Sequence, residues 1–461
     1  DMRRLLPLRF ILTSTENDFD GFMTDTIHGH EQRMRRLLDK LDAEKRGWLH
    51  RCGEMAAIRG GCAYLVGGSV RDLILGKDQV DLDVVIEGDG MGVAQDLARD
   101  LAGDLTSHHA FQTAAVTTAN GFRIDVTTAR GEEYKRPGQL PQIVPGNLAD
   151  DLARRDFTIN TMAISLSEPN FGTFIDPHDG RLDLEEGYIR VMHSRSFADD
   201  PTRVFRALRF SLRYGYRIEV RTEEWMDEAI SGDYLGTVSG ERVCKELRVM
   251  FMESPIQGPY RLEAKGVLPV VHAGLRFHHE VLNGLQELIE WWQEAKGGAS
   301  LVAKPKGWLM VLGCCARGLS SQERWNLASQ LRLSREERGP LIDSGVPWCR
   351  ATSLLSGASS QPLNSMVERA LREIDRGALL VGASIAGVDS AEAEMVRIYL
   401  DQLHGVAAEL DGFELKKLGV PQGPLVGEVL ERLRTAKLDG KAPNASIERR
   451  LVKSWLAENQ L

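Results

Sequence analysis

The sequence predicts an α+β protein, with a mixed α/β domain near the N-terminus and an all-helical remainder. Apolar segments of strand length are concentrated between residues 61 and 130. Beyond residue 195, apolar positions recur at intervals of three and four, as they do in amphipathic helices. The chain has 461 residues, too many for one hydrophobic core, so we expect several domains.

Composition limits the class of protein. Hydrophobic residues make up 43% and charged residues 27%, as in ordinary globular proteins, and no apolar run reaches the length of a membrane span. A short apolar run interrupted by Pro7 and Arg9 is not typical of a signal peptide. The net charge of −9 argues against nucleic-acid binding over the whole surface but allows a local basic groove. The six cysteines form no C-x-x-C pair, which indicates reduced thiols, no disulfide-linked partner and a cytoplasmic location.

The order of elements follows from periodicity and from turn residues. Residues 26–60 have a helical pattern, and the predicted strands and helices after it are strands 62–68, 80–88, 111–120 and 122–130, with helices 70–76 and 90–105 among them. Three prolines and two glycines predict a mobile loop over residues 136–147. Helical patterns then dominate, and a Gly/Ser-rich break at 354–362 predicts a boundary between two helical bundles.

Two carboxylates lie inside an apolar strand. Asp81 and Asp83 are two residues apart, so they share one face of the strand while Leu82 and Val84 point to the other. Neighbouring carboxylates repel each other unless cations compensate, as two Mg²⁺ ions do in two-metal sites. Asp125, in a second apolar strand, is the candidate third acid. The three acids predict metal-dependent phosphoryl transfer; the alternative is that all three are exposed on the polar face of a half-solvated sheet.

A Gly-Gly turn precedes these acids. In "VGGSVRD", Gly67 and Gly68 separate an apolar strand from a helix, where glycines let a phosphate approach the backbone and helix N–H groups. Arg71 in the first helical turn is suited to the same anion. An ordinary strand–turn–helix junction is the alternative interpretation.

Two arginine-rich segments follow. In "DDLARRDFTINTMAIS", Arg154 and Arg155 supply charge suited to a triphosphate, Asp156 can orient an arginine, and Asn160 can bond a ribose hydroxyl. The alternative is a surface helix with Asp156 as its N-cap. Residues 201–220 contain five arginines against one acid, at spacings that form a helical stripe: Arg203, Arg206, Arg209, Arg213 and Arg217. This excess of arginine favours contact with a polyanion, and a solvated helix face is the alternative.

Five motifs in order carry a resemblance to a known family: "GGSVRD…DLD", "RRDFTINTMA", "DPHDGRLDL", "DDPTRVFRALRF" and "ERVCKEL". Over roughly residues 60–255 the chain resembles the class II tRNA nucleotidyltransferases (CCA-adding enzymes) and the related bacterial poly(A) polymerases. The resemblance implies a small polymerase-β-like head domain with a mixed sheet, followed by all-α neck, body and tail domains. The implied divisions are an N-terminal helical extension or linker 1–59, head 60–195, neck 196–265, body 266–360 and a tRNA-binding tail 361–461.

The resemblance also implies roles for residues. Asp81 and Asp83 would bind Mg²⁺ in a two-metal site and, with Asp125, form the catalytic set. The implied nucleotide-binding residues are Gly67, Gly68, Arg71, Asp72, Arg154, Arg155, Asp156, Asn160, Asp199, Asp200, Arg203 and Arg206. The family's base-reading pattern Glu-Asp-x-x-Arg begins here with Asp199, one methylene shorter than Glu. That leaves Asp200 and Arg203 as the expected base readers. The "ERVCKEL" helix would brace the neck through Glu241, Arg242 and Glu246.

The activity implied is addition of CMP and/or AMP from CTP or ATP to the 3′ end of tRNA, with tRNA and these nucleotides as partners. A poly(A) polymerase acting on mRNA has the same head chemistry, but the mixed charge of the last twenty residues favours tRNA. A catalytically silent RNA-binding protein and a nucleotidyltransferase for small molecules are further alternatives. The silent protein would not need clustered acids, and the small-molecule enzyme would not need the long helical body.

Overall fold

The computed structural model describes residues 38–39, 41–78, 81–295, 307–357 and 362–458. Contacts divide the described residues into two compact units. The first runs to Lys135 and resumes over Pro141–His193, and the second comprises Arg136–Leu140 and the chain from Ser194 onward. Residues 1–25, the N-terminal part of the predicted extension, lie outside the described residues, as do several residues of the predicted break at 354–362. The five-part division stays a prediction.

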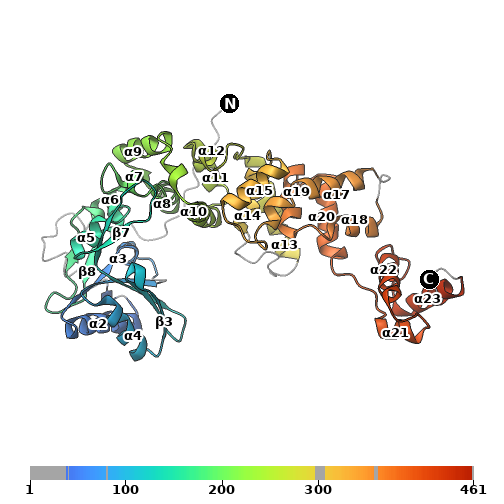
Figure 1. The fold of residues 1–461 in the computed structure, drawn as a ribbon, viewed down its shortest axis with the longest axis horizontal. Coiled ribbons are helices and arrows are strands. Elements are labelled where there is room, and N and C mark those ends of the chain that lie inside the picture. Colours follow the sequence, from blue (N-terminus) through green and yellow to red (C-terminus); the bar gives the residue numbers. More distant parts are fainter. Residues whose placement is uncertain (1–37, 40, 79–80, 296–306, 358–361, 459–461) are drawn as a thin grey trace, which may run out of the picture. The chain divides into compact units, whose positions relative to one another are not determined.

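The first unit contains a mixed sheet covered by helices, as predicted (Figure 1), and the sheet has seven strands. Its order is β3-β4-β5-β2-β1-β8-β9, in which β2 and β5 are parallel and the other neighbours antiparallel. The strands are β1 (Cys62–Val66), β2 (Asp81–Glu87), β3 (Asp104–His108), β4 (Thr113–Thr117), β5 (Arg123–Thr128), β8 (Ala163–Ser165) and β9 (Phe174–Ile175). Strand β2 is therefore central.

The two faces of the sheet are covered differently. Helices α2 (Ala43–Ile58) and α4 (Gly90–Asp100) contact each other and pack on one face, which β2 meets with side chains that are almost wholly buried: Leu82, Val84 and Ile86. Helix α5 (Leu148–Ala153) packs on the other face, where Val85 lies in its apolar cluster. Alternation along β2 thus places Asp81 and Asp83 on the α5 side of the sheet.

The predicted mobile loop is only partly a loop. Strand β7 (Gln142–Pro145) pairs with β6 (Arg130–Glu133) in a two-stranded antiparallel sheet. The prediction of a loop over the whole of 136–147 was therefore wrong. Ile143 and Val144 favour a strand, and Pro145 is tolerated because β7 lies at an edge, where a missing N–H breaks no ladder.

Short elements connect the sheet and complete the first unit. Helix α3 (Gly68–Ile74) begins directly after Gly67, and α5 begins at a capping box formed by Asn147 and Asp150. The remaining elements are the 3₁₀ turns His109–Phe111 and Thr158–Asn160, helix α6 (Gly180–Glu186) and strand β10 (Tyr188–Ile189).

The second unit is helical, as predicted. Its α-helices are α7 (Ser196–Asp199), α8 (Arg203–Tyr214), α9 (Val220–Ser231), α10 (Gly240–Glu253), α11 (Gln257–Ala264), α12 (Val267–Val271), α13 (His279–Ala295), α14 (Gly307–Cys315), α15 (Ser321–Gln330), α16 (Gly339–Ile342), α17 (Val346–Ser356), α18 (Asn364–Leu371), α19 (Arg376–Ala386), α20 (Ala391–Ile398), α21 (Gly412–Lys417), α22 (Pro424–Leu438) and α23 (Ala445–Ala457). A two-residue strand, β11 (Arg217–Ile218), a 3₁₀ turn at Tyr234–Thr237 and a π-helical turn at Tyr399–Leu403 interrupt them.

The predicted arginine stripe does not form one solvated helix face. Helix α8 ends at Tyr214, so Arg217 lies on β11. Arg203 and Arg209 are buried, at 5% and 8% exposure, because α8 packs much of its circumference against neighbouring helices. Glu253 of α10 accepts hydrogen bonds from both Arg209 and Arg213.

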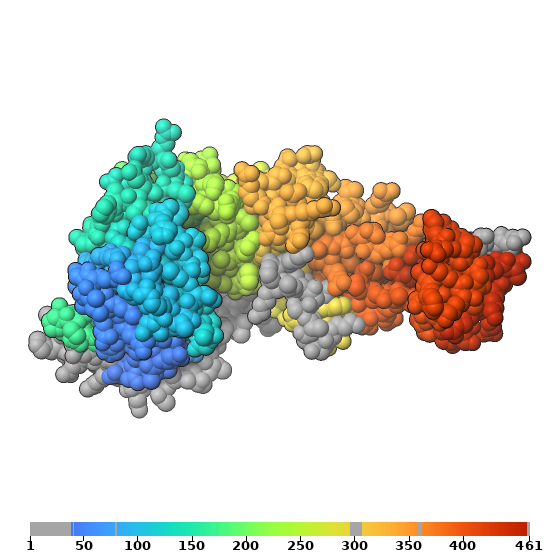
Figure 2. Space-filling view, turned by 60° about the horizontal axis from the view of Figure 1, so that its bottom comes forward, coloured from blue at the N-terminus to red at the C-terminus, as the bar shows by residue number. Residues whose placement is uncertain are grey.

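The last helices have a core of their own. Helices α21–α23 and the adjoining turns enclose six buried apolar residues: Leu410, Leu415, Val420, Val429, Leu433 and Val452. These helices are the red part of the chain in Figure 2. None of the helices in the described ranges is both long and apolar enough to cross a membrane. All six cysteines are free thiols, of which Cys62 and Cys349 are exposed.

Candidate active site

The three predicted acids lie together on one face of the sheet. The parallel register of β2 and β5 places Asp83 beside Asp125, and Asp81 is one pleat away on the same face. Asp81 is exposed, whereas Asp83 and Asp125 are half-buried. The structure therefore brings the carboxyl groups to one region of the central strands.

The environment of Asp83 opposes its negative charge. Burial raises the pKa of Asp83 to about 6; the charges of Arg155 and Arg71 act against this shift, and those of Asp81 and Asp125 add to it. Burial and the charge of Asp125 also raise the pKa of Asp81. Within the described residues, no ion pair or side-chain hydrogen bond reaches the carboxylate of Asp81 or Asp83. Among the residues that the structure describes, this carboxylate pair therefore has no protein counter-ion in direct contact.

Asp125 is neutralised instead by a neighbour that the sequence reading missed. Arg123 Nε donates to both oxygens of Asp125 at 2.9 Å, and its Nη2 donates to Oδ1 at 2.7 Å. In the part of the chain that the structure describes, no group of three or more His, Cys, Asp and Glu side chains could hold a metal ion. The i,i+2 spacing of Arg123 and Asp125 on one strand face was the available signal. Two carboxylate side chains, Asp81 and Asp83, still have the oxygen-donor chemistry that suits Mg²⁺.

The Gly-Gly turn borders these acids. Gly67 has a φ of 63°, which favours glycine, and a Cβ on Gly67 would lie 2.2 Å from Arg155 Nη1. A Cβ on Gly68 would lie 3.4 Å from Arg71 Nη2 and 3.7 Å from Asp83 Oδ2. The turn therefore adjoins two guanidinium groups and one of the acids, with no side chain of its own to fill the space.

Arg71 joins the turn to the second predicted motif. The buried guanidinium donates to Asp72 through Nε at 2.9 Å and Nη2 at 3.1 Å, and Nη1 donates to Asn160 Oδ1. Asn160 Nδ2 in turn donates to Asp156 Oδ1 at 2.8 Å. Both ends of the Asn160 amide are thus held by the protein. Asp156 is not a helix N-cap, because the segment after it is a 3₁₀ turn capped by Phe157.

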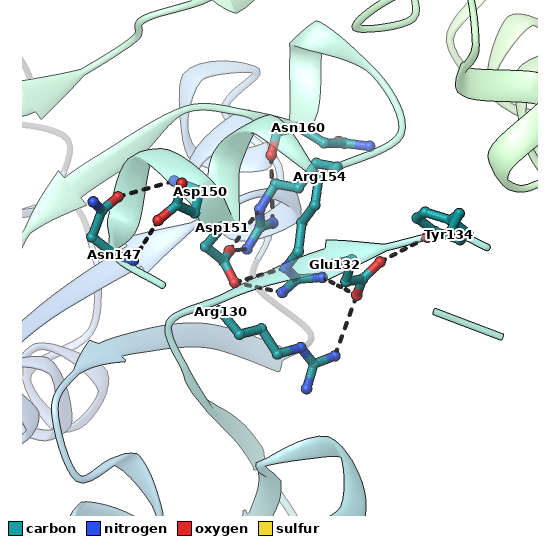
Figure 3. Close-up of polar contacts among 9 residues, drawn as sticks. Arg130, Glu132, Tyr134, Asn147, Asp150, Asp151, Arg154 and Asn160 are labelled. Carbon is teal, nitrogen blue, oxygen red and sulfur yellow. Dashed lines mark hydrogen bonds and ion pairs between the residues drawn. The ribbon is translucent and has the colours of Figure 1, made fainter. Parts of the chain in front are cut away.

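Arg154 and Arg155 converge on one carboxylate that the sequence reading did not single out (Figure 3). Asp151 is fully buried, and each of its two oxygens accepts from a different arginine. Arg154 also donates from Nη1 to Glu132 Oε1 at 3.0 Å. The i,i+3 and i,i+4 spacings from Asp151 were the signal in the sequence that could have found this arrangement.

The remaining predicted residues lie in the second unit. Asp200 Oδ1 accepts from Thr202 Oγ1 at 2.7 Å and from Arg242 Nη2 at 2.6 Å. Arg203 is buried, and its Nη1 lies 3.4 Å from the backbone oxygen of Ser196. Asp199 pairs with Arg195 at 3.5 Å, and the Arg206 guanidinium lies 5.4 Å from the centre of the Phe210 ring. Their joint action with the residues of the sheet stays a prediction.

Fold and site together define a class. A central strand of a mixed sheet carries a carboxylate pair beside a Gly-Gly turn lined by arginines, and a long helical unit follows. These are the features of a nucleotidyltransferase head domain joined to helical domains. The family model that matches the chain, "Poly A polymerase head domain", covers residues 63–190.

Curated relatives narrow the class. An A-adding tRNA nucleotidyltransferase of Halalkalibacterium halodurans is 32% identical over 86% of this chain and 89% of its own length. One of Geobacter sulfurreducens is 34% identical over 84% of this chain, which spans only 44% of that relative. Other relatives are named CC-adding tRNA nucleotidyltransferase and CCA-adding enzyme. The chain belongs to the family of tRNA nucleotidyltransferases.

Solved structures agree with this assignment. The Thermotoga maritima CCA-adding enzyme complexed with tRNA has a TM-score of 0.71 and 28% identity, over 92% of this chain and 98% of its own. A CCA-adding enzyme in complex with ATP has a TM-score of 0.74 and 27% identity, over 93% of this chain and 98% of its own. The similarity therefore includes the helical unit as well as the sheet.

Proposed function

We propose that this protein adds AMP and/or CMP to the 3′ end of tRNA without a nucleic-acid template. The observation that carries the proposal is the pair Asp81 and Asp83 on a central strand, beside a glycine turn that adjoins Arg71 and Arg155. The 3′-hydroxyl oxygen of the RNA attacks the α-phosphorus of ATP or CTP. A new phosphodiester bond forms, the bond from the α-phosphorus to the bridging oxygen breaks, pyrophosphate leaves, and the proton of the hydroxyl is released to solvent.

The acids are suited to divalent cations. Asp81 and Asp83 would hold Mg²⁺, which in such sites lowers the pKa of the attacking hydroxyl and neutralises charge on phosphoryl oxygens. The chain itself contributes positive charge on the other side of the turn. Arg155 and Arg71 stabilise the triphosphate and the charge that develops on the leaving pyrophosphate, and Gly67 and Gly68 leave room for those phosphates.

The bases would be read by the second unit. Asp200 and Arg203 offer an acceptor and donors of the kind that pair with the polar edge of a base, and Arg242 holds the carboxylate of Asp200 in place. Structures of a CCA-adding enzyme in complex with ATP and with CTP support a nucleotide-binding role for this family. Among the possible specificities we favour AMP, because the two relatives compared above, each matching more than four-fifths of the chain, are A-adding.

The principal alternative is a poly(A) polymerase, which the name of the matching head-domain model favours. The chemistry of the head is the same for both, so residues of the sheet do not separate them. The helical unit favours tRNA as the substrate, because the structural similarity to a CCA-adding enzyme solved with tRNA covers 92% of this chain and so includes that unit.

One assay tests these assignments. The purified protein is given tRNAs lacking three, two or one of their terminal nucleotides, or an unstructured oligoribonucleotide, with each labelled nucleoside triphosphate in turn. We expect AMP addition to tRNA that lacks only its last nucleotide. CMP addition to the shorter tRNAs would assign CC or CCA addition, and a long A tail on the oligoribonucleotide would assign poly(A) synthesis. No addition to any substrate would contradict the proposal and support a silent RNA-binding protein.

A further inference from the structure

Asp151 forms a fork that holds two consecutive arginines. It lies in α5, is fully buried, and shares a side of the sheet with the acids. Its Oδ1 accepts from Arg154 Nε at 3.0 Å, and its Oδ2 accepts from Arg155 Nη2 at 2.9 Å and Nε at 3.2 Å. A buried carboxylate is costly unless it is paired, and here one carboxylate is paired twice.

Beyond the fork the two arginines have different partners. Arg154 continues to Glu132 on β6, whose other oxygen accepts from Tyr134. Arg155 turns its Nη1 to the backbone oxygen of Asn160 at 3.4 Å and to the Gly67 turn, where a Cβ would lie 2.2 Å away. One guanidinium is therefore anchored in the β6–β7 sheet and the other faces the candidate nucleotide site.

This divergence needs the carboxylate between them. Two guanidinium groups on adjacent residues repel each other, and neither rotamer is set by the backbone. Asp151 takes Nε and Nη2 of Arg155, which leaves Nη1 as the group that reaches the turn. A planar guanidinium bound on one edge in this way has its opposite edge fixed in direction.

We propose that Asp151 is a positioning residue for nucleotide binding: it orients Arg155 toward the phosphates of a nucleoside triphosphate bound at the Gly67–Gly68 turn. Arg154 has the separate role of tying α5 to β6 through Glu132. The inference rests on the proposed function, because it assumes that the turn receives a nucleoside triphosphate. Asp151 would then determine which of the two arginines contacts the nucleoside triphosphate.

The test is a double-mutant cycle read out as equilibrium ATP binding by calorimetry, with Mg²⁺ and without tRNA, so that no turnover occurs. Asp151→Asn keeps the shape of the side chain but replaces one acceptor oxygen by a donor. We expect Asp151→Asn and Arg155→Ala each to weaken ATP binding about tenfold or more, and the double variant to be no weaker than Arg155→Ala alone. Multiplication of the two losses in the double variant would overturn the inference, because Asp151 would then act independently of Arg155.

Glu132→Gln is the matched control, since it alters the contacts of Glu132 with Arg154, Arg130 and Tyr134 and leaves the Asp151–Arg155 contact intact. We expect Glu132→Gln to change ATP affinity less than threefold. In the double variant with Arg155→Ala, the two fold-changes in affinity should multiply, as they do for independent sites. If Asp151→Asn does not fold, as judged by circular dichroism, Arg155→Lys replaces it: a lysine cannot form the two-nitrogen contact, so ATP affinity should fall as for Arg155→Ala. Native affinity in Arg155→Lys would overturn the inference. The proposed function is tested separately, because this cycle measures ATP binding and not nucleotide addition. If the unmodified protein adds no nucleotide to tRNA, the proposed function is contradicted.

Discussion

Asp83 is the residue at which the needs of the fold and of the proposed chemistry conflict most clearly. Its carboxylate lies on a central strand beside Asp125 and next to Asp81, and burial raises its pKa to about 6. Its ordinary value is 3.8, so the folded state disfavours the ionised form that a cation would need. A carboxylate kept in such a place has a cost in stability that only a ligand recovers.

We expect Asp83→Asn to abolish nucleotide addition and, in a metal chelator at pH 8, to raise the free energy of unfolding by about 1–2 kcal/mol. The folded pKa is raised, so the stabilising contribution of protonated Asp83 is present below about pH 4 and is lost as the pH rises through about 6. The side-chain amide of the Asp83→Asn variant is uncharged at every pH, so its burial has no such cost. The stability advantage of the variant should therefore be absent below pH 4 and complete above pH 6, as measured by urea unfolding across this range.

Asp104→Asn is the control for that experiment, because Asp104 is an exposed carboxylate on the edge strand β3. Both its stability and its activity should stay at the level of the unmodified protein. Activity of Asp83→Asn within tenfold of that level would contradict the metal assignment. A variant less stable at pH 8 than the unmodified protein would contradict the electrostatic account.

At the scale of elements, α10 braces Asp200, one of the two residues proposed to read the base. Arg242 donates from Nη2 to Asp200 and from Nη1 to the backbone oxygen of Gly138 at 3.0 Å, so one side chain holds two segments. The sequence motif predicted a bracing role for this helix. The partners follow only from the packing of α10 against its neighbours, because Asp200 is 42 residues away from Arg242 in the chain.

We expect Arg242→Gln to reduce the ratio of kcat/KM for the preferred nucleotide over the other by about tenfold, because Asp200 loses its charged partner and its orientation. Single-turnover addition with ATP and with CTP measures this ratio. Arg248→Gln, on the same helix but paired with Glu337, is the matched control and should leave the ratio unchanged. An unchanged ratio in Arg242→Gln would show that Asp200 is not a base reader or that Arg242 does not position it.

The elements show where local pattern is sufficient and where it fails. Apolar alternation correctly predicted β2 and β5, since each has a buried face that sets its register. It did not predict β3, which is exposed along its length and lacks that alternation. The β6–β7 pair was missed because proline and glycine around it are typical of loops, and an edge strand tolerates both.

At the scale of the whole molecule, the described residues contain more than one hydrophobic core. The six-residue cluster of α21–α23 includes Val429 and Leu433, both fully buried, and the partly buried apolar side chains packed against it lie within residues 408–456. A cluster of this kind can loosen without disturbing the sheet that carries the acids.

We expect Leu433→Ala to destabilise the last helices by about 2–4 kcal/mol through the cavity it leaves, with no change in ATP affinity. Hydrogen exchange followed by mass spectrometry should show faster exchange in residues 410–456 and unchanged exchange in β2 and β5. Addition to tRNA should fall because this segment is the predicted tRNA-binding tail.

The control is Leu354→Ala, at a position 63% exposed, which should have none of these effects. Faster exchange in the sheet as well would show that the cores unfold together.

The sequence by itself determined the mixed head, the helical remainder and the shared face of Asp81 and Asp83. Strand alternation and the position of the Gly-Gly turn are local properties, and the order of the motifs is read directly. Tertiary structure alone decided how the charges are paired. Arg71 meets Asn160 across 89 residues and Arg154 meets Glu132 across 22, because these pairs depend on which strands and turns are neighbours. Even the local pairs, Arg123 with Asp125 and Asp151 with Arg155, depend on burial and side-chain rotamers, which spacing permits but does not impose.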